Sequence, residues 1–308
     1  MKLIEPKVEL IEQAPGLVGM YKHIEKCSRT CYKSEDKITE DSYKKIYNNL
    51  VQRGHLAMLE HGTVYLKFPY NDNCNYYAKI LEKYVFNPYS KIADKYAYVT
   101  TNLRVIVENH WEDDLKYICE PTEFHERRIT LKFITNIGVT REGNRHRVNS
   151  IAEESTRYCN YNLDKFDKSI TFCLPTWINK NATEIQACRT AEVQSDMLAD
   201  MRVNMDLSDN WNTIDWYLYA LSTSALAYKN LIKLGCKPQQ AREVLPLATK
   251  SEVVYTAFAS DWKHWFDLRL VGTTGKPHPN MEQVTRLAQQ ELIKNNLWKL
   301  IYHDNKHD

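Results

Sequence analysis

The chain has 308 residues, of which 43% are hydrophobic and 26% are charged, a composition that excludes a largely disordered or fibrous protein. Its 41 basic and 39 acidic residues leave a net charge of +2, too balanced for a nucleic-acid coat or a membrane-binding surface, so any anionic ligand must be held by local clusters of charge. The first residues lack the charged and apolar segments of a signal peptide, and no apolar run approaches a membrane span, so we expect a cytoplasmic protein that contacts neither membrane nor nucleic acid.

The elements follow from the spacing of apolar residues. Spacings of three and four predict helices over 17–32 and 40–53. Strict alternation predicts a strand over 62–68, and two more β-rich stretches follow at 96–107 and 128–137. From about residue 180 onward the pattern is helical, with apolar faces in the segments 221–232 and 284–292.

Strands that precede helices predict an α+β class, with a mostly antiparallel sheet flanked by helices and a helical C-terminal half. No repeat or linker divides the chain, so we expect a single domain over 1–308. Polar or unassigned stretches near 70–95, 108–126 and 180–215 are expected to be insertions.

Cysteines do not indicate a metal centre. Of the eight, only Cys27 and Cys31 are close in sequence, and no second pair completes a zinc tetrad. We therefore expect reduced thiols and no metal.

The densest chemical segment runs from Arg145 to Tyr158. It contains Arg145, Arg147 and Arg157, and arginine presents a rigid fork of donors suited to phosphates and carbonyl edges. Three arginines so close together need anionic partners. Either Glu153 and Glu154 are those partners, which would make the segment a self-neutralised surface, or a ligand is.

The order of residues in this segment resembles a known signature. Arg145-His146-Arg147, seven residues and then Ser155 is similar to the motif of the flavin-dependent thymidylate synthases. Glu153, Arg157 and Tyr158 match the continuation of that motif, whereas Ala152 stands where many members have Asn. Six further segments resemble the family in the expected order, over roughly 20–290: Ser28–Tyr32, Gly54–His61, Thr101–Val105, Ala241–Pro246, Trp262–Arg269 and His278–Met281.

Each segment taken alone also has a simpler interpretation. His55 and His61 suit buried or turn histidines, and Arg242 suits a cap on the short helix that ends before Pro246. Trp262, Trp265 and Phe266 are expected to build the core. Arg269 could pair with a helix dipole.

The resemblance implies the thymidylate synthase complementing-protein type of fold and the reductive methylation of dUMP to dTMP. FAD is the implied cofactor, and NADPH and 5,10-methylenetetrahydrofolate are the implied co-substrates. It also implies a homotetramer whose active sites are shared between subunits. The chain has no GxGxxG loop to hold a dinucleotide, and no Pro-Cys pair of the kind used by flavin-free thymidylate synthases.

The resemblance assigns roles residue by residue. Arg269 is the implied catalytic residue, since its guanidinium would stabilise the negative charge that develops on the pyrimidine ring. The implied dUMP-binding residues, with Arg157 and Arg242 on the phosphate, are Glu142, Arg145, Glu153, Glu154, Ser155, Thr156, Arg157 and Arg242. Ser155 is expected to bind and not to act as a nucleophile, because no base stands at an interpretable spacing.

For FAD, the resemblance implies positive charge from Arg145, His146 and Arg147. Phe258 stands where some relatives have Asn, which puts that contact in doubt. The other implied cofactor residues are Cys31, His55, Ala57, Glu60, Glu153, Ala259, Ser260, His264, Leu268 and His278.

Two rival functions stay open at this point. A relative with the same fold could carry out another one-carbon reaction on a nucleotide, such as pyrimidine hydroxymethylation. A nucleic-acid-binding module could use the arginine-rich segment and the 20 tyrosines, although the balanced charge and the interspersed glutamates argue against it.

Overall fold

The centre of the molecule is a four-stranded antiparallel sheet in the order β2-β6-β9-β7. Its strands are β2 (Lys7–Leu10), β6 (Arg128–Asn136), β9 (Lys250–Phe258) and β7 (Ser150–Glu153). The computed structural model describes residues 1–69, 82–178 and 211–302. The predicted insertion at 180–215 and the first half of that at 70–95 therefore lie mostly outside the described residues.

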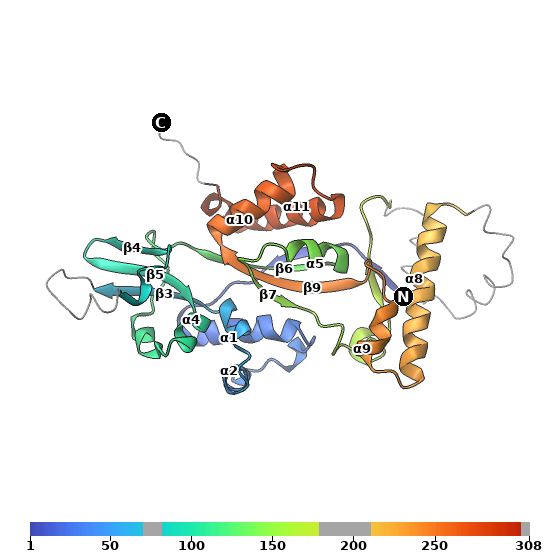
Figure 1. Cartoon of the computed structure of the whole chain (residues 1–308), viewed down its shortest axis with the longest axis horizontal. Helices are drawn as coiled ribbons and strands as arrows, with labels where there is room; N and C mark the ends of the chain where they lie inside the picture. The colour runs from blue at the N-terminus through green and yellow to red at the C-terminus, as the bar shows by residue number, and fades with distance from the viewer. Residues whose placement is uncertain (70–81, 179–210, 303–308) are drawn as a thin grey trace.

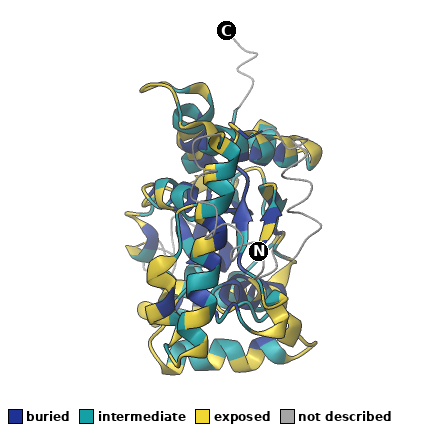
Figure 2. Ribbon diagram, turned by 90° about the vertical axis from the view of Figure 1, so that its right-hand side faces the viewer, coloured by how far each residue is buried: buried dark blue, intermediate teal, exposed yellow. Residues whose placement is uncertain are grey.

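Helices cover both faces of this sheet (Figure 1). On one face, Leu131 and Phe133 of β6 and Tyr255 of β9 pack against Trp262 and Trp265. These tryptophans belong to α10 (Ala259–Phe266), which α11 (Pro279–Lys294) accompanies. The other face meets α1 (Gly16–Thr30), with α2 (Ser42–Gln52) beyond it. Buried residues accordingly concentrate between the helical layers (Figure 2), and the predicted core role of the tryptophans is confirmed.

A second antiparallel sheet extends the molecule to one side, at the left of Figure 1. It has the order β3-β5-β4, with strands β3 (Thr63–Pro69), β5 (Tyr96–Asn102) and β4 (Ser90–Ala93). Its core includes Val64, Leu66 and Val99, against η2 (Leu56–His61) and α4 (Leu103–Glu108).

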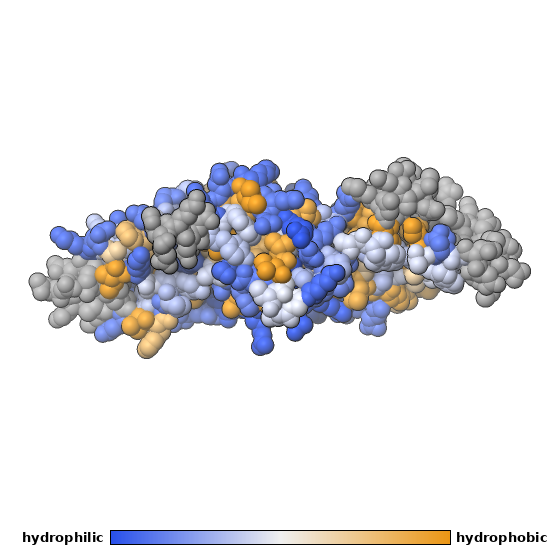
Figure 3. All heavy atoms as spheres, turned by 90° about the horizontal axis from the view of Figure 1, so that it is seen from above, coloured by the Kyte–Doolittle hydropathy of each residue, from blue (hydrophilic) through white to orange (hydrophobic). Residues whose placement is uncertain are grey.

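At the opposite end, the parallel pair β1 (Lys2–Ile4) and β8 (Thr171–Cys173) packs against α8 (Thr213–Lys233). The other short helical elements are η1 (Glu35–Lys37), η3 (Glu112–Tyr117), η4 (Asp164–Phe166), α9 (Pro238–Ala241), η6 (Arg242–Val244) and η8 (Trp298–Leu300). Seen from above, the molecule is elongated and its surface is mostly hydrophilic, with separate apolar clusters (Figure 3). Within the described ranges, no helix has both the length and the apolar character needed to cross a bilayer.

The predicted class of a mostly antiparallel sheet with flanking helices is confirmed. The helices at 17–32 and 40–53 and the strand at 62–68 are present as α1, α2 and β3. The β-rich stretch at 96–107 is wrong in its second half, because the Asn102 side chain accepts a hydrogen bond from the Val105 amide (3.2 Å) and starts α4. The C-terminal half also contributes β9, which the pattern did not predict.

Candidate active site

A cavity of about 590 Å³, here called the basic cavity, opens where three parts of the chain meet. The first part is the segment that follows α5 (Ile137–Gly143), the second is the end of α10 with the π-helical turn η7 (Asp267–Val271), and the third is the loop that leads into α11. It brings together eight of the predicted residues: Glu142, Arg145, His146, Arg147, His264, Leu268, Arg269 and His278.

The local sequence explains how the signature segment reaches this cavity. β6 ends at Asn136, whose side chain accepts a hydrogen bond from the Val139 amide (2.9 Å) and starts α5. α5 ends at Gly143, where an added Cβ would lie 2.3 Å from the Tyr255 hydroxyl and 2.9 Å from the Trp265 ring. Only glycine fits here, so the chain can pass close over the core and present the following arginines at the surface.

Arg269 is fixed by three contacts. Its Nε donates to His146 Nε2 (3.1 Å), its Nη1 to Glu142 Oε2 (3.4 Å) and its Nη2 to the Glu142 carbonyl (3.2 Å). The guanidinium is thus held in one orientation at the wall of the cavity before any ligand arrives.

His146 differs from the sequence-based expectation. Its ring is buried and lies 4.5 Å from the Trp265 ring. Burial, followed by the positive charge of Arg269, lowers the pKa of His146 to about 4. The imidazole is neutral at pH 7 and can accept the Arg269 hydrogen bond. The expectation that it supplies positive charge is therefore corrected.

The cations around the cavity outnumber the carboxylates. Arg145, Arg147 and Lys276 line it and are exposed, and none of the three forms an ion pair with a carboxylate in the described part of the chain. Glu142 is the one carboxylate among the described lining residues, and Arg269 engages it. This arrangement suits an anionic ligand and disfavours the alternative of a self-neutralised surface.

A second cavity of about 320 Å³, here called the Ser155 cavity, involves the other predicted nucleotide residues. Its predicted lining residues are Glu153, Glu154, Ser155, Thr156 and Arg242. Arg242 Nη1 donates to Thr156 Oγ1 (3.2 Å). The Glu153 carboxylate accepts hydrogen bonds from Asn144 Nδ2 (3.0 Å) and Ser251 Oγ (2.9 Å).

Glu154 belongs to the wall of this cavity, but its carboxylate is bound in the interior. It pairs with Lys250 Nζ (2.7 Å) and accepts from the Tyr161 hydroxyl (3.1 Å). Burial raises the pKa of Glu154, and Lys250 offsets that effect in part. Lys250 also pairs with Glu252 (2.6 Å), so the segment 153–156 is anchored to β9.

The remaining predicted residues lie apart from these two cavities. The Cys31 carbonyl accepts from the Ser155 amide (2.9 Å), and burial raises the pKa of the Cys31 thiol to about 11. Arg157 is exposed and bonds Gln239 (3.3 Å). His55, Ala57 and Glu60 belong to η2 and the residue before it, where Glu60 pairs with Arg104 (2.5 Å). Phe258 and Ser260 flank Ala259, which lines a different cavity.

Two residues that lie beside the predicted ones were not identified from the sequence. Lys276 stands in a loop whose composition gives no hint of a ligand. Arg128, at the start of β6, donates to the Glu60 carbonyl (2.9 Å) and to Ser150 Oγ (3.1 Å), and lies 5.3 Å from the Phe258 ring. It connects three segments predicted to bind the cofactor, but in the sequence it is only a polar residue at the edge of a strand.

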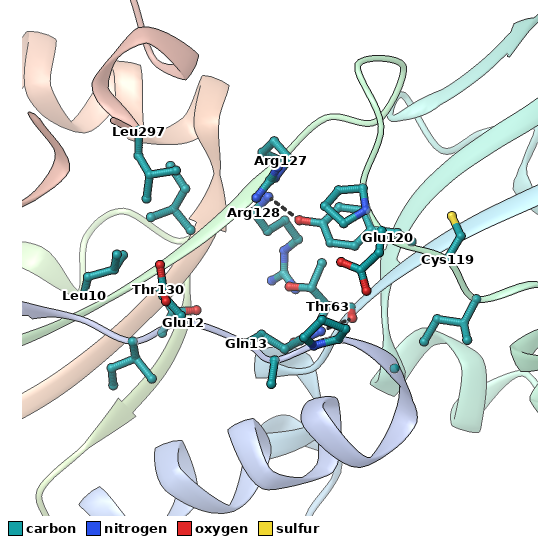
Figure 4. A pocket seen from close by; sticks show the side chains of 18 residues that line it. Leu10, Glu12, Gln13, Thr63, Cys119, Glu120, Arg127, Arg128, Thr130 and Leu297 are labelled. Carbon is teal, nitrogen blue, oxygen red and sulfur yellow. Dashed lines mark hydrogen bonds between the residues drawn. The ribbon is translucent and has the colours of Figure 1, made fainter. Parts of the chain in front are cut away.

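Metal ligation is not indicated in the described ranges, because they hold no group of three or more His, Cys, Asp or Glu side chains arranged around an ion. Another cavity, of about 600 Å³, lies between β2, β3 and β6, with Gln13, Arg127 and Arg128 in its wall (Figure 4). It contains none of the predicted residues.

Comparisons with known proteins agree on one family. The family model described as thymidylate synthase complementing protein matches residues 97–294. The flavin-dependent thymidylate synthase of Pyrococcus abyssi (strain GE5 / Orsay) is 27% identical over 126 residues, which cover 41% of this chain and 39% of that protein. The alignment thus spans well under half the length of this relative.

Solved structures of similar proteins include a UMP/dUMP methylase PolB from Streptomyces cacaoi. Its complexes with 5-Br dUMP and 5-Br UMP align with 96% and 97% of this chain and 93% of theirs, at 16% identity and a TM-score of 0.43.

Proposed function

The chain belongs to the thymidylate synthase complementing protein family, and we propose that it is a flavin-dependent thymidylate synthase that converts dUMP to dTMP. The carbon donor is 5,10-methylenetetrahydrofolate, and NADPH is the reductant. FAD, when bound, supplies the hydride that completes the methyl group.

The observation that carries this proposal is the arrangement around Arg269. Glu142 and the neutral imidazole of His146 hold its guanidinium at the wall of the basic cavity, whose other cations have no carboxylate partner among the described residues. Fixed donors stabilise a charge as it develops, at no cost of reorganisation. Arg269 would thus donate hydrogen bonds to the carbonyl edge of the pyrimidine as negative charge spreads over the ring.

FAD fits the residues that are present. A pyrophosphate needs fixed cations, and Arg145, Arg147 and Lys276 have no carboxylate partner in the described part of the chain. With no GxGxxG loop, these side chains would take over the role that backbone amides play in a Rossmann fold.

The dUMP phosphate is assigned to the Ser155 cavity. Arg242, with the hydroxyls of Thr156 and Ser155, supplies donors there, and Arg157 lies in the same part of the chain. Ser155 Oγ has no hydrogen bond to a basic side chain within the described residues, which supports a role in binding.

We infer that a complete site needs more than one subunit. Within one chain the predicted residues are divided between the basic cavity, the Ser155 cavity and the η2 region. Symmetric assembly can place such patches opposite one another. A homotetramer with shared active sites is therefore the proposed assembly.

Ligand titration tests the proposal without depending on turnover. Purified protein is titrated with FAD by flavin fluorescence and with dUMP by calorimetry. Saturable binding of both supports the proposal. Binding of neither, together with a strong and salt-sensitive affinity for DNA or RNA, would favour the nucleic-acid-binding module instead.

A further inference from the structure

A cavity of about 480 Å³ lies beside the start of α10, between the second sheet and the segment 121–127. We call it the Tyr89 cavity. Its wall includes Tyr89, Lys91 and Arg127, together with Ala259, which the resemblance places at the cofactor. Neither the pyrimidine-facing Arg269 nor the predicted phosphate-binding residues belong to it.

Tyr89 forms an aromatic pair with Phe258. The ring centroids are 3.5 Å apart and the planes are inclined by 16°. The backbone of Tyr89 is held by two hydrogen bonds. Its amide donates to Asn87 Oδ1 (3.0 Å), and its carbonyl accepts from the Thr100 amide (3.1 Å). The Arg128 guanidinium, itself held by the Glu60 carbonyl and Ser150, lies 5.3 Å from the Phe258 ring. The pair is thus a rigid, partly exposed aromatic face of the kind that stacks on planar ligands.

Arg127 gives an independent indication of a ligand. Its Nε is buried without a hydrogen-bond partner, and its guanidinium forms no ion pair among the described residues. It lines both the Tyr89 cavity and the neighbouring cavity of about 600 Å³ (Figure 4). A guanidinium is an obligatory donor, and leaving one of its N–H groups unpaired costs free energy that an anionic ligand would recover.

Helix α10 links this cavity to the basic cavity. Ala259 at its first position lines the Tyr89 cavity, and His264, five residues later, lines the basic cavity. Five helical residues rise by about 7.5 Å. A dinucleotide, with two planar rings joined by a pyrophosphate, needs two such neighbouring subsites.

We propose that the Tyr89 cavity binds the adenosine-phosphate half of FAD. This inference rests on the proposed function. The redox ring must approach the pyrimidine near Arg269, so the half that lies remote from the chemistry is the one available to the Tyr89 cavity. Tyr89 stacks on the adenine, and Arg127 donates to a phosphate.

Affinities for FAD and FMN, measured by flavin fluorescence, test the assignment because FMN lacks the adenosine half. Tyr89→Ala should weaken FAD binding about tenfold and leave FMN binding within about twofold. Tyr89→Phe, which keeps the ring, should bind FAD like the wild type. Arg127→Gln should weaken FAD more than FMN. Tyr96→Ala, on β5 and outside the cavity, is the matched control.

The possible results separate the inference from the function on which it rests. Equal losses for FAD and FMN in Tyr89→Ala would place the isoalloxazine ring at Tyr89 and overturn the assignment, as would unchanged FAD binding in a variant with a wild-type circular dichroism spectrum. If the wild type binds neither flavin, the proposed function itself fails. If the wild type binds FAD and the variants do so equally well, only the inference fails.

Discussion

At the scale of single residues, burial against Trp265 and the positive charge of Arg269 keep the imidazole of His146 neutral. Arg145, His146, Arg147 and Ser155 could be recognised because their spacing is a local property of the chain. The protonation state of His146 could not be predicted in this way. It results from burial against Trp265 and from the charge of Arg269, and both residues are more than a hundred positions away in the sequence. Lys276 and Arg128 were missed for the same reason, since their neighbours are set by folding.

Arg269→Ala should lower kcat/KM for dUMP by about 10²–10³, because it removes a fixed donor to the charge that develops on the ring. Steady-state kinetics of dTMP formation measures this. Arg286→Ala is the control, since Arg286 forms an exposed pair with Glu282 on α11, and it should change kcat/KM less than about twofold. A comparable loss in both variants would contradict a specific role for Arg269.

Ser155→Ala should retain dTMP synthesis with weakened dUMP binding, because the hydroxyl is assigned to the phosphate and not to bond formation. The KM for dUMP and kcat, measured separately, check this. Complete loss of turnover with intact dUMP binding would instead identify Ser155 as a nucleophile.

At the scale of elements, the pattern of apolar residues did not predict strand β9. Its run Val253-Val254-Tyr255 is buried on both faces, so it has no alternation that separates a strand from a buried helix. The sequence also did not indicate that the charged residues of β9 would be buried in an ionic cluster. Lys250 and Glu252 form a buried cluster with Glu154, Lys132 and Lys33. Burial raises the pKa of Glu252, but the three lysines outweigh burial and hold that pKa well below its usual range.

Lys250→Met should therefore destabilise the fold by about 3 kcal/mol, because it leaves the Glu154 carboxylate buried without its cation. Urea denaturation measures the free energy of unfolding of each variant. Lys263→Met, which breaks the half-exposed pair with Asp267, should cost less than about 1 kcal/mol. Equal effects would mean that the buried cluster does not anchor the segment 153–156.

At the scale of the whole molecule, the order of strands and helices predicted the class of fold. It did not predict that the candidate site residues would be divided between separate cavities. A motif indicates which residues act together, but not whether one chain places them together. The basic cavity and the Ser155 cavity are separate within the chain, which only the three-dimensional structure reveals.

Stability should fall as the pH decreases from about 6.5 to 5. Burial is the main cause that lowers the pKa of His23 to about 4, of His61 to about 3 and of His146 to about 4, from the usual histidine value of about 6.5. Below pH 6.5 the unfolded chain binds protons that the folded chain does not, so each histidine lowers the free energy of unfolding by up to about 1.4 kcal/mol per pH unit. Burial also lowers the pKa of His125. Urea midpoints at pH 7.5, 6 and 5 measure the slope, and His23→Gln should reduce it by about a quarter to a third. A constant midpoint would contradict the buried neutral state.

If active sites are shared between subunits, two active-site variants should complement each other in mixed oligomers. Arg269→Ala and Arg242→Ala should each be strongly impaired alone. They should regain about a quarter of wild-type activity when unfolded together and reassembled, because mixed oligomers contain some sites with both arginines intact. The separately refolded variants, combined under conditions that prevent exchange, are the control. No recovery in verified mixed oligomers would mean that both arginines of a site come from one chain.

Formation of dTMP tests the proposed activity without an intermediate step. Purified protein is supplied with FAD, dUMP, 5,10-methylenetetrahydrofolate and NADPH, with each component omitted in turn. Mass spectrometry identifies the nucleotide product. We expect dTMP only when all four are present. A hydroxymethylated pyrimidine, or no nucleotide product from protein that binds both FAD and dUMP, would contradict it.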